Sequence, residues 1–221
     1  MKLYFIPGLG FDDRVFARLN LPDYAVHVLN WIEPELRETL GSYTDRMTKR
    51  LPSDTEKVIL VGHSLGGMIS QTIASRVSLG GLILISTIES RAENPLRFRF
   101  IKPLGLHRVL NKELILASFP FWAASYGYET PEEQTLFKKM VSQHRNRYYR
   151  WALRALSTWK EQQLPAELPV LRLHGRLDQT FPLQLTQGVD HILESGSHLM
   201  VYSQGETISE VISRFISNIK P

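Results

Sequence analysis

The hydrophobic residues of the chain fall into two alternating kinds of segment. Short apolar-rich runs occupy residues 2–6, 25–29, 58–61, 81–86, 169–175 and 189–193, and the central ones lack polar alternation. Such runs are typical of parallel strands that are buried on both faces. Apolar residues at helical spacing recur between and after these runs, most clearly over residues 208–219. The pattern predicts an α/β fold with a mostly parallel central sheet of about six strands and helices on both faces.

Three further helices are predicted from their boundaries and apolar stripes. Asp12 or Asp13 can cap a short helix that runs through Leu19. Apolar residues at helical spacing predict a second helix over residues 36–51. Residues 68–76 predict a third helix, which begins shortly after the run at 58–61.

Residues 88–160 interrupt the alternation of strands and helices. This segment has no convincing strand pattern, and it holds 12 of the 22 aromatic residues. It carries 13 Lys and Arg against 6 Asp and Glu, whereas the rest of the chain carries 13 against 16. We interpret it as an inserted helical lid. Residues 1–87 and 161–221 then form one core domain, which is an ordinary size for a single domain.

The third apolar run leads directly into Gly62–Gly66, which fits the pattern G-x-S-x-G. In a nucleophile elbow this pentapeptide turns sharply from a strand into a helix and leaves the serine at the apex. Gly62 and Gly66 have no Cβ to clash where the turn closes. The following helix would direct its first N–H groups toward Ser64, where they favour developing negative charge. The pentapeptide also occurs by chance, but the predicted strand before it and helix after it favour a nucleophile.

A serine nucleophile needs a base, and the base needs an acid that orients it. Of the five histidines that follow Ser64, His198 is the best candidate, because it lies in a loop of small residues between the last strand and the last helix. Asp178 is the preferred acid, since it follows a predicted strand at the edge where active sites of open α/β sheets lie. Glu89, just past the preceding strand, is the alternative acid.

These motifs, in this order, resemble those of the α/β-hydrolase-fold superfamily, in particular its small lidded serine esterases and thioesterases. Residues 62–67 resemble the family elbow. Residues 174–182 resemble its H-G-x-x-D-x-x-x-P acid loop, and Gly196–His198 resembles its histidine loop. Residues 7–10 resemble the oxyanion stretch H-G-x-G, although Pro7 replaces the usual His.

The resemblance implies that the backbone N–H groups of Leu9 and Leu65 form an oxyanion hole. It implies no cofactor and no metal. The residues themselves support these two donors. Leu65 is expected to open a helix, and the glycines at 8 and 10 let the loop that carries Leu9 approach Ser64 closely.

We therefore predict a serine hydrolase that cleaves a carboxylic ester or thioester through an acyl-Ser64 intermediate. His198 would accept the proton of Ser64, and Asp178 would hold the required tautomer. Two alternatives stay open: a C–C bond hydrolase or lyase on the same triad, and a low-turnover ligand-binding receptor of the same fold. The family's dehalogenases and epoxide hydrolases use an Asp at the elbow, so Ser64 argues against both.

The aromatic side chains of residues 88–160 are too many for a solvated surface. They either line an apolar acyl pocket above the nucleophile or only hold the lid on the core. The candidates for the pocket are Phe119, Phe121, Trp122 and Trp151.

The basic residues of the same segment also permit two interpretations. A positive field favours the encounter of anionic partners, such as a small-molecule or carrier-bound acyl substrate. Alternatively, the charges only keep the lid soluble. The two groups to test are Arg97, Arg99 and Lys102, and Arg145, Arg147 and Arg150.

Several other classes of protein are disfavoured. Gly8–Gly10 could begin a dinucleotide fingerprint, but Asp13 stands where the third Gly is required and would repel a pyrophosphate. Residues 96–102 alternate basic and apolar side chains, which is typical of an amphipathic face rather than of a nucleic-acid site. The chain has no Cys, and no run approaches the ~18 apolar residues of a membrane span. The first residues do not form a signal peptide, so a cytoplasmic location is predicted. The pattern indicates no particular oligomeric state.

Overall fold

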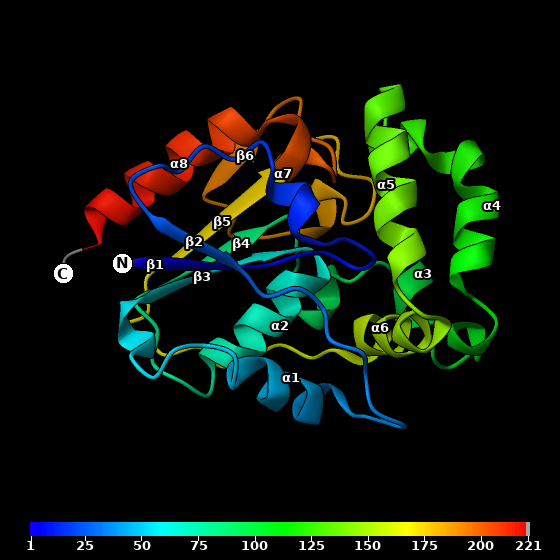
Figure 1. Ribbon diagram of the computed structural model, residues 1–221, viewed down its shortest axis with the longest axis horizontal. Helices are drawn as coiled ribbons and strands as arrows, with labels where there is room; N and C mark the ends of the chain where they lie inside the picture. The colour runs from blue at the N-terminus through cyan, green and yellow to red at the C-terminus, as the bar shows by residue number, and fades with distance from the viewer. Residues whose placement is uncertain (220–221) are drawn as a thin grey trace.

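The computed structural model describes residues 1–219 and contains a six-stranded parallel sheet at its centre. Neighbouring strands follow the order β2-β1-β3-β4-β5-β6, and every pair is parallel (Figure 1). The sheet confirms the predicted architecture. Its strands are β1 (Lys2–Ile6), β2 (Ala25–Val28), β3 (Val58–His63), β4 (Gly81–Ile85), β5 (Val170–Gly175) and β6 (His191–Leu193).

Helices cover both faces of the sheet. Figure 1 shows α1 and α2 below the sheet and α8 above it. The α-helices are α1 (Leu40–Thr48), α2 (Leu65–Ala74), α3 (Leu96–Arg99), α4 (Lys112–Trp122), α5 (Pro131–Gln143), α6 (Asn146–Thr158), α7 (Met200–Ser203) and α8 (Gly205–Asn218). None of these helices, within residues 1–219, is both long and apolar enough to cross a membrane.

The position of each strand explains its sequence pattern. Every residue of β3 and β4 is buried, because both strands lie in the middle of the sheet under helices on either side. This burial accounts for their continuous apolar runs. In contrast, β2 is an edge strand, and its first three residues are exposed. The strand predicted at residues 25–29 is therefore present over Ala25–Val28, at an exposed edge of the sheet.

The first α-helix is shorter than the apolar spacing predicts. It begins at Leu40 because Thr39 and Ser42 form a reciprocal capping box, in which the Ser42 N–H donates to Thr39 Oγ1 at 3.1 Å. Leu36 lies before the cap and is 82% exposed. The next residue, Arg37, has a φ of 60°, which no α-helix accommodates. Leu36 therefore fits the helical spacing of apolar residues only by chance.

The segment between β4 and β5 contains α3, α4, α5 and α6, joined by loops and short 3-10 turns. In Figure 1 these four helices stand together beyond the carboxyl ends of the strands. Within the described part of the chain, residues 88–160 contribute no strand to the sheet. The segment therefore lies at the sheet edge where the candidate catalytic residues are expected.

Candidate active site

Ser64 lies at the turn between β3 and α2, with a φ of 54° and a ψ of −121°. A positive φ is strained for a residue with a side chain, so the surroundings must hold it. A Cβ on Gly62 would lie 2.5 Å from the Cα of Gly67, and a Cβ on Gly66 would lie 2.1 Å from the carbonyl oxygen of Ile6. Both distances are too short for real atoms. Only glycine fits these positions, as the sequence pattern predicts.

Hydrogen bonds hold the backbone of Ser64 on both sides. Its N–H donates to the carbonyl of Ile85 at 2.9 Å, and its own carbonyl accepts from the Thr87 hydroxyl at 2.7 Å. Both partners lie at or just beyond the end of β4. The neighbouring strand therefore stabilises the strained turn, and the serine side chain stays at its apex.

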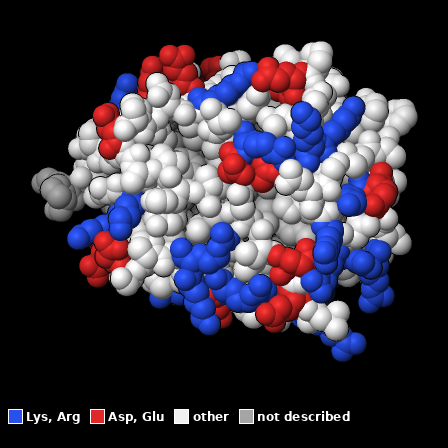
Figure 2. Space-filling view, viewed as in Figure 1, with Lys and Arg blue, Asp and Glu red and all other residues white. Residues whose placement is uncertain are grey.

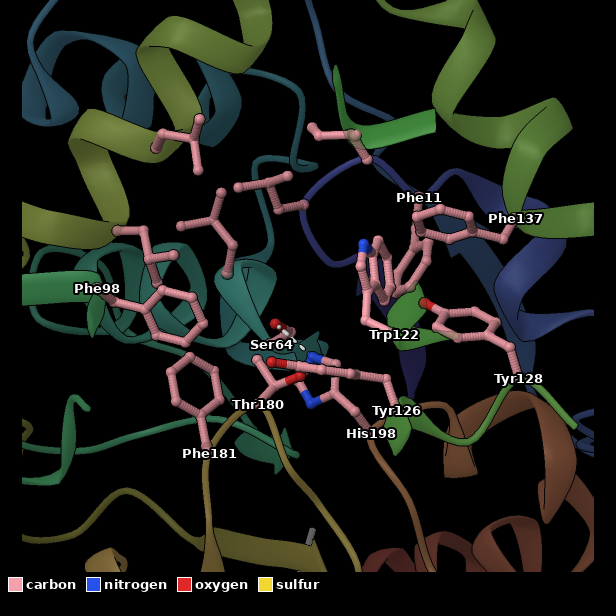
Figure 3. A pocket seen from close by; sticks show the side chains of 15 residues that line it. Phe11, Ser64, Phe98, Trp122, Tyr126, Tyr128, Phe137, Thr180, Phe181 and His198 are labelled. Atoms are coloured by element: carbon pink, nitrogen blue, oxygen red, sulfur yellow. Dashed lines mark hydrogen bonds between the residues drawn. The ribbon is translucent and has the colours of Figure 1, made fainter. Parts of the chain in front are cut away.

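The structure brings together the three residues predicted to form a triad. Ser64 Oγ lies 3.0 Å from His198 Nε2 (Figure 3). On the other side of the same ring, His198 Nδ1 lies 2.8 Å from Asp178 Oδ2. All three residues are buried. The predicted nucleophile, base and orienting acid are thus in hydrogen-bond contact, and such an arrangement can activate a serine.

Asp178 is held in place from two sides. Its Oδ1 accepts the backbone N–H groups of Thr180 at 2.7 Å and Phe181 at 3.0 Å, which leaves Oδ2 for the histidine. Burial by itself would raise the pKa of Asp178. The charge of His198 and its hydrogen bond outweigh burial, with help from the backbone, and the pKa is lowered. The carboxylate is therefore ionised and orients the imidazole.

Glu89, the alternative acid, contacts a different partner. Its Oε2 lies 3.0 Å from Arg172 Nη1, and the other nitrogen of the same guanidinium lies 3.0 Å from Glu93 Oε2. Arg172 and Glu93 are nearly completely buried. Glu89 therefore belongs to an ion-pair cluster that ties β5 to the segment after β4, while Asp178 contacts His198.

The backbone N–H groups of Leu9 and Leu65 are both close to the nucleophile. Leu65 is the first residue of α2, and a Cβ on Gly8 would lie 3.1 Å from the Cβ of Ser64. Within residues 1–219 neither N–H takes part in an intramolecular hydrogen bond. Two unengaged donors beside a serine, one of them at a helix N-terminus, suit a developing oxyanion.

Side chains distant in sequence anchor the loop that carries Leu9. The indole N–H of Trp31 donates to the carbonyl of Gly8 at 2.9 Å, and the N–H of Gly10 donates to the hydroxyl of Tyr148 at 3.1 Å. Tyr148 is completely buried, and burial raises its pKa well above the ordinary value, so it stays a neutral phenol. These contacts hold a loop in which Pro7 replaces the family's usual His. Neither anchor was predicted from the sequence, because no local motif signals them.

His63, which precedes the nucleophile, was also missed. Its Nε2–H donates to the backbone carbonyl of His198 at 3.0 Å, so it positions the loop that carries the base. The side chain is completely buried, and Nδ1 has no hydrogen-bond partner in the described structure. Burial, helped by the neighbouring His198, lowers the pKa of His63 to about 3. The imidazole is therefore neutral in the folded protein at ordinary pH.

We expect His63 to make the stability of the protein fall in acid. Between pH 6.5 and about 3 the unfolded chain binds a proton at this position and the folded protein does not. The contribution of His63 to the free energy of unfolding is complete above pH 6.5. It is lost progressively below that pH, by up to about 1.4 kcal/mol per pH unit. Urea unfolding at several pH values between 7 and 4 should show a shallower loss of stability in His63→Gln than in the wild type. His144 and His174, whose pKa values burial also lowers, remain in both proteins. Parallel pH dependences would contradict this assignment.

An apolar pocket of about 210 Å³ opens at Ser64, with side chains that converge from the core and from residues 88–160 (Figure 3). Its described lining contains no Lys, Arg, Asp or Glu. Within residues 1–219, moreover, no three His, Asp or Glu side chains converge to hold a metal ion. Besides Ser64, His198, Leu9 and Leu65, the lining consists of Phe11, Phe98, Ile115, Trp122, Tyr126, Tyr128, Phe137, Leu153, Leu156, Thr180 and Phe181.

Of the four residues predicted to line this pocket, only Trp122 does so. Phe121 is 89% exposed, because consecutive residues of a helix point about 100° apart and its neighbour occupies the inner position. Phe119 is completely buried behind the pocket and stacks on Phe137, with ring centroids 4.5 Å apart. Trp151 is buried against α1 instead. The prediction was therefore wrong for Phe119, Phe121 and Trp151.

Comparison with known proteins relates the chain to a family of enzymes. A model of the alpha/beta hydrolase family matches residues 3–211. Among solved structures, MenH from S. aureus is 19% identical, with a TM-score of 0.74 over 100% of this chain and 95% of that one. A malate-bound thermophilic esterase from Thermogutta terrifontis is 18% identical, with a TM-score of 0.73 over 100% and 91%. The enol-lactonase from Burkholderia xenovorans is 16% identical, with a TM-score of 0.71 over 99% and 92%. At these identities the structural matches show a shared fold. No sequence match to a curated protein was found.

Proposed function

The chain belongs to the alpha/beta hydrolase family, and from this premise we propose that it is a serine hydrolase that cleaves a carboxylic ester or thioester. One observation carries the proposal. Ser64 Oγ and Asp178 Oδ2 contact the two ring nitrogens of His198, at 3.0 and 2.8 Å. This geometry activates a hydroxyl for attack on an acyl carbon.

Each step of the proposed reaction uses the same three side chains. As Ser64 Oγ attacks the acyl carbon, its proton passes to Nε2 of His198. The imidazolium then protonates the departing alcohol or thiol, which leaves an acyl-Ser64 ester. Water attacks this ester while His198 accepts its proton, and the return of that proton to Ser64 Oγ releases the carboxylic acid. Asp178 stays ionised throughout and holds the proton on Nδ1.

The negative charge that develops on the acyl oxygen would meet the N–H groups of Leu9 and Leu65. Both donors are backbone groups, so they stay in place without side-chain motion. A preorganised donor of this kind is typically worth about 10² to 10³ in rate. The anchoring of the first loop by Trp31 and Tyr148 therefore supports catalysis as well as folding.

The lining of the pocket supports an uncharged, apolar acyl group as substrate. Aromatic and aliphatic side chains surround the position next to Ser64, and the described lining contains no Lys or Arg to neutralise a carboxylate there. An anionic group on the substrate would belong to its leaving-group side, outside this pocket.

We further propose that residues 88–160 act as a lid on a core of residues 1–87 and 161–221. The segment supplies more than half of the pocket's lining, including Phe98, Trp122 and Leu153. Arg97 also connects it to the acid loop, since its guanidinium donates to the backbone carbonyls of Gln179 and Thr180. The segment would thereby cover the site.

A fluorophosphonate probe tests the proposed function directly. We expect it to label the wild type at Ser64, identified by peptide mass spectrometry, and to leave Ser64→Ala unlabelled. Turnover is then measured on panels of neutral esters and thioesters with graded acyl chains. Labelling together with turnover of either panel supports the proposal. Labelling without turnover would favour the C–C bond hydrolase or lyase, or the low-turnover receptor, and would overturn it.

We expect Trp122 to determine acyl-chain preference, and Phe121 provides a matched control on the same helix. Trp122→Ala enlarges the pocket, so kcat/KM for a long-chain ester should rise relative to that for an acetyl ester by about tenfold or more, since one methylene in such a pocket is worth about 10- to 200-fold. Phe121→Ala removes an exposed ring and should leave the ratio unchanged. Steady-state kinetics on acetyl to octanoyl esters give both ratios. If both variants shift the ratio equally, Trp122 does not set the preference.

A further inference from the structure

A second cleft, of about 350 Å³, lies beside α6. The residues of α6 that line it differ from those that line the apolar pocket. Five guanidinium groups line it, and we call it the arginine cleft. Figure 2 shows Lys and Arg side chains gathered over this end of the molecule, where Figure 1 places α6. The five residues are Arg37, Arg108, Arg147, Arg150 and Arg154.

The arginines of α6 are arranged unfavourably for the helix itself. Arg147, Arg150 and Arg154 stand three and four residues apart, so they share one face and repel one another. The first turn of α6 contains no acidic residue, and Arg145 at the N-cap makes no side-chain capping bond. Positive charge near a helix N-terminus is also unfavourable, because the helix dipole is positive there. An anion in the cleft would relieve both effects.

Acidic side chains of the protein neutralise only part of this charge. Arg147 forms an ion pair with Glu33, with Nε and Oε1 2.8 Å apart. Four of the five, Arg37, Arg108, Arg150 and Arg154, form no ion pair with a carboxylate within residues 1–219. Four arginines thus line one hollow without a carboxylate partner.

The two carboxylates in the lining both form ion pairs with Arg46, which lies outside the lining. Glu38 is buried, and its Oε2 lies 2.8 Å from Nη1 of Arg46, while Glu35 lies 3.7 Å from Nε of the same residue. Arg154 donates to the backbone carbonyl of Glu38, whereas the side-chain carboxylate of Glu38 accepts a hydrogen bond from Arg46. The cleft therefore keeps a net positive charge, and its concave shape focuses that field.

We propose that the arginine cleft binds a small ligand that carries two linked phosphate groups. Guanidinium groups match phosphate oxygens through paired, charge-assisted hydrogen bonds, which favours phosphate over a compact monovalent anion. Four arginines without a carboxylate partner provide more charge than one phosphate group neutralises. The site is a hollow rather than a flat face, which suits a small molecule better than the surface of an acidic protein. The proposal goes beyond the proposed hydrolase activity and rests on none of its residues.

Calorimetric titration with inorganic pyrophosphate tests this assignment. In 0.1 M NaCl at pH 7.5 we expect the wild type to bind one equivalent, more tightly than it binds orthophosphate, and to bind more weakly in 0.5 M NaCl. Arg108→Ala and Arg150→Ala should each weaken binding about tenfold or more. Arg214→Ala, which removes an exposed arginine of α8, should bind as the wild type does. Ser64→Ala should also bind normally, so that failure of the proposed catalysis and failure of this site are distinguishable.

Thermal unfolding without ligand provides a second readout. Arg150→Ala relieves the repulsion along α6, so it should unfold at the same temperature as the wild type or a higher one, and pyrophosphate should stabilise the wild type more than this variant. The absence of saturable binding by the wild type would overturn the proposal. So would equal affinities in the wild type, Arg108→Ala and Arg150→Ala. Tighter binding of polyglutamate than of pyrophosphate would overturn it too, because an extended acidic chain would then be the better ligand.

Discussion

Ser64→Ala is expected to lower kcat on the preferred ester or thioester by a factor of about 10³ or more. The serine oxygen is the only hydroxyl in contact with His198 Nε2 in the described structure, at 3.0 Å, so no neighbouring side chain replaces it. Losing the covalent path leaves only the oxyanion donors and the pocket to accelerate attack by water. The substitution removes one atom in a turn that glycines and β4 hold, and the fold should be retained.

Steady-state kinetics and circular dichroism on the purified variant check this expectation together. Ser142→Ala is a matched control, since its hydroxyl is exposed on α5 and contacts only its own helix. The control should keep full activity. Near wild-type turnover by Ser64→Ala, with the fold intact, would show that another group is the nucleophile.

Asp178→Asn is expected to lower kcat by about 10³ to 10⁴ while it leaves the fold nearly unchanged. The backbone N–H groups of Thr180 and Phe181 require an acceptor at Oδ1, so the amide oxygen of Asn must occupy that position. The amide NH₂ then faces His198 Nδ1 and makes this nitrogen an acceptor. The ring proton moves to Nε2, where it prevents His198 from accepting the proton of Ser64.

Glu89→Gln is the control for the choice of acid. Glu89 contacts Arg172 rather than His198, and its side chain is 35% exposed. This variant should therefore keep kcat within a few-fold of the wild type, as measured on the same substrate. A large loss of activity in Glu89→Gln together with an active Asp178→Asn would move the acid to Glu89.

Local chain geometry explains which features were predictable from the sequence. The elbow needs glycines at 62 and 66 because both approach backbone atoms closely. This requirement can be recognised from the five consecutive residues 62–66 alone. Central strands carry unbroken apolar runs because helices cover both of their faces. The carboxyl ends of parallel strands meet at one edge of the sheet. A serine after β3 and an acid after β5 were therefore expected to lie close together.

Two features account for the failed predictions, namely the residue at which a helix begins and the rotation of a helix against the core. Leu36 continues an apolar stripe, but the capping box at Thr39 starts the helix later and leaves Leu36 exposed. Phe121 and Trp122 are neighbours of similar character, and only the direction in which α4 faces the core separates them. Their roles depend on how a helix is rotated against the rest of the protein, which composition and periodicity do not specify.

The sequence by itself therefore determined the α/β sheet, the strained serine turn and the order of serine, acid and histidine, because each depends on neighbouring residues or on strand ends that any parallel sheet brings together. Only the tertiary structure decided which aromatic side chains line the pocket and that Tyr148 and Trp31 anchor the loop at Gly8–Gly10. It also decided that Arg37, Arg108 and Arg150 meet in one cleft. These contacts join residues far apart in the chain, and their geometry arises from the packing of whole helices, for which no local pattern exists.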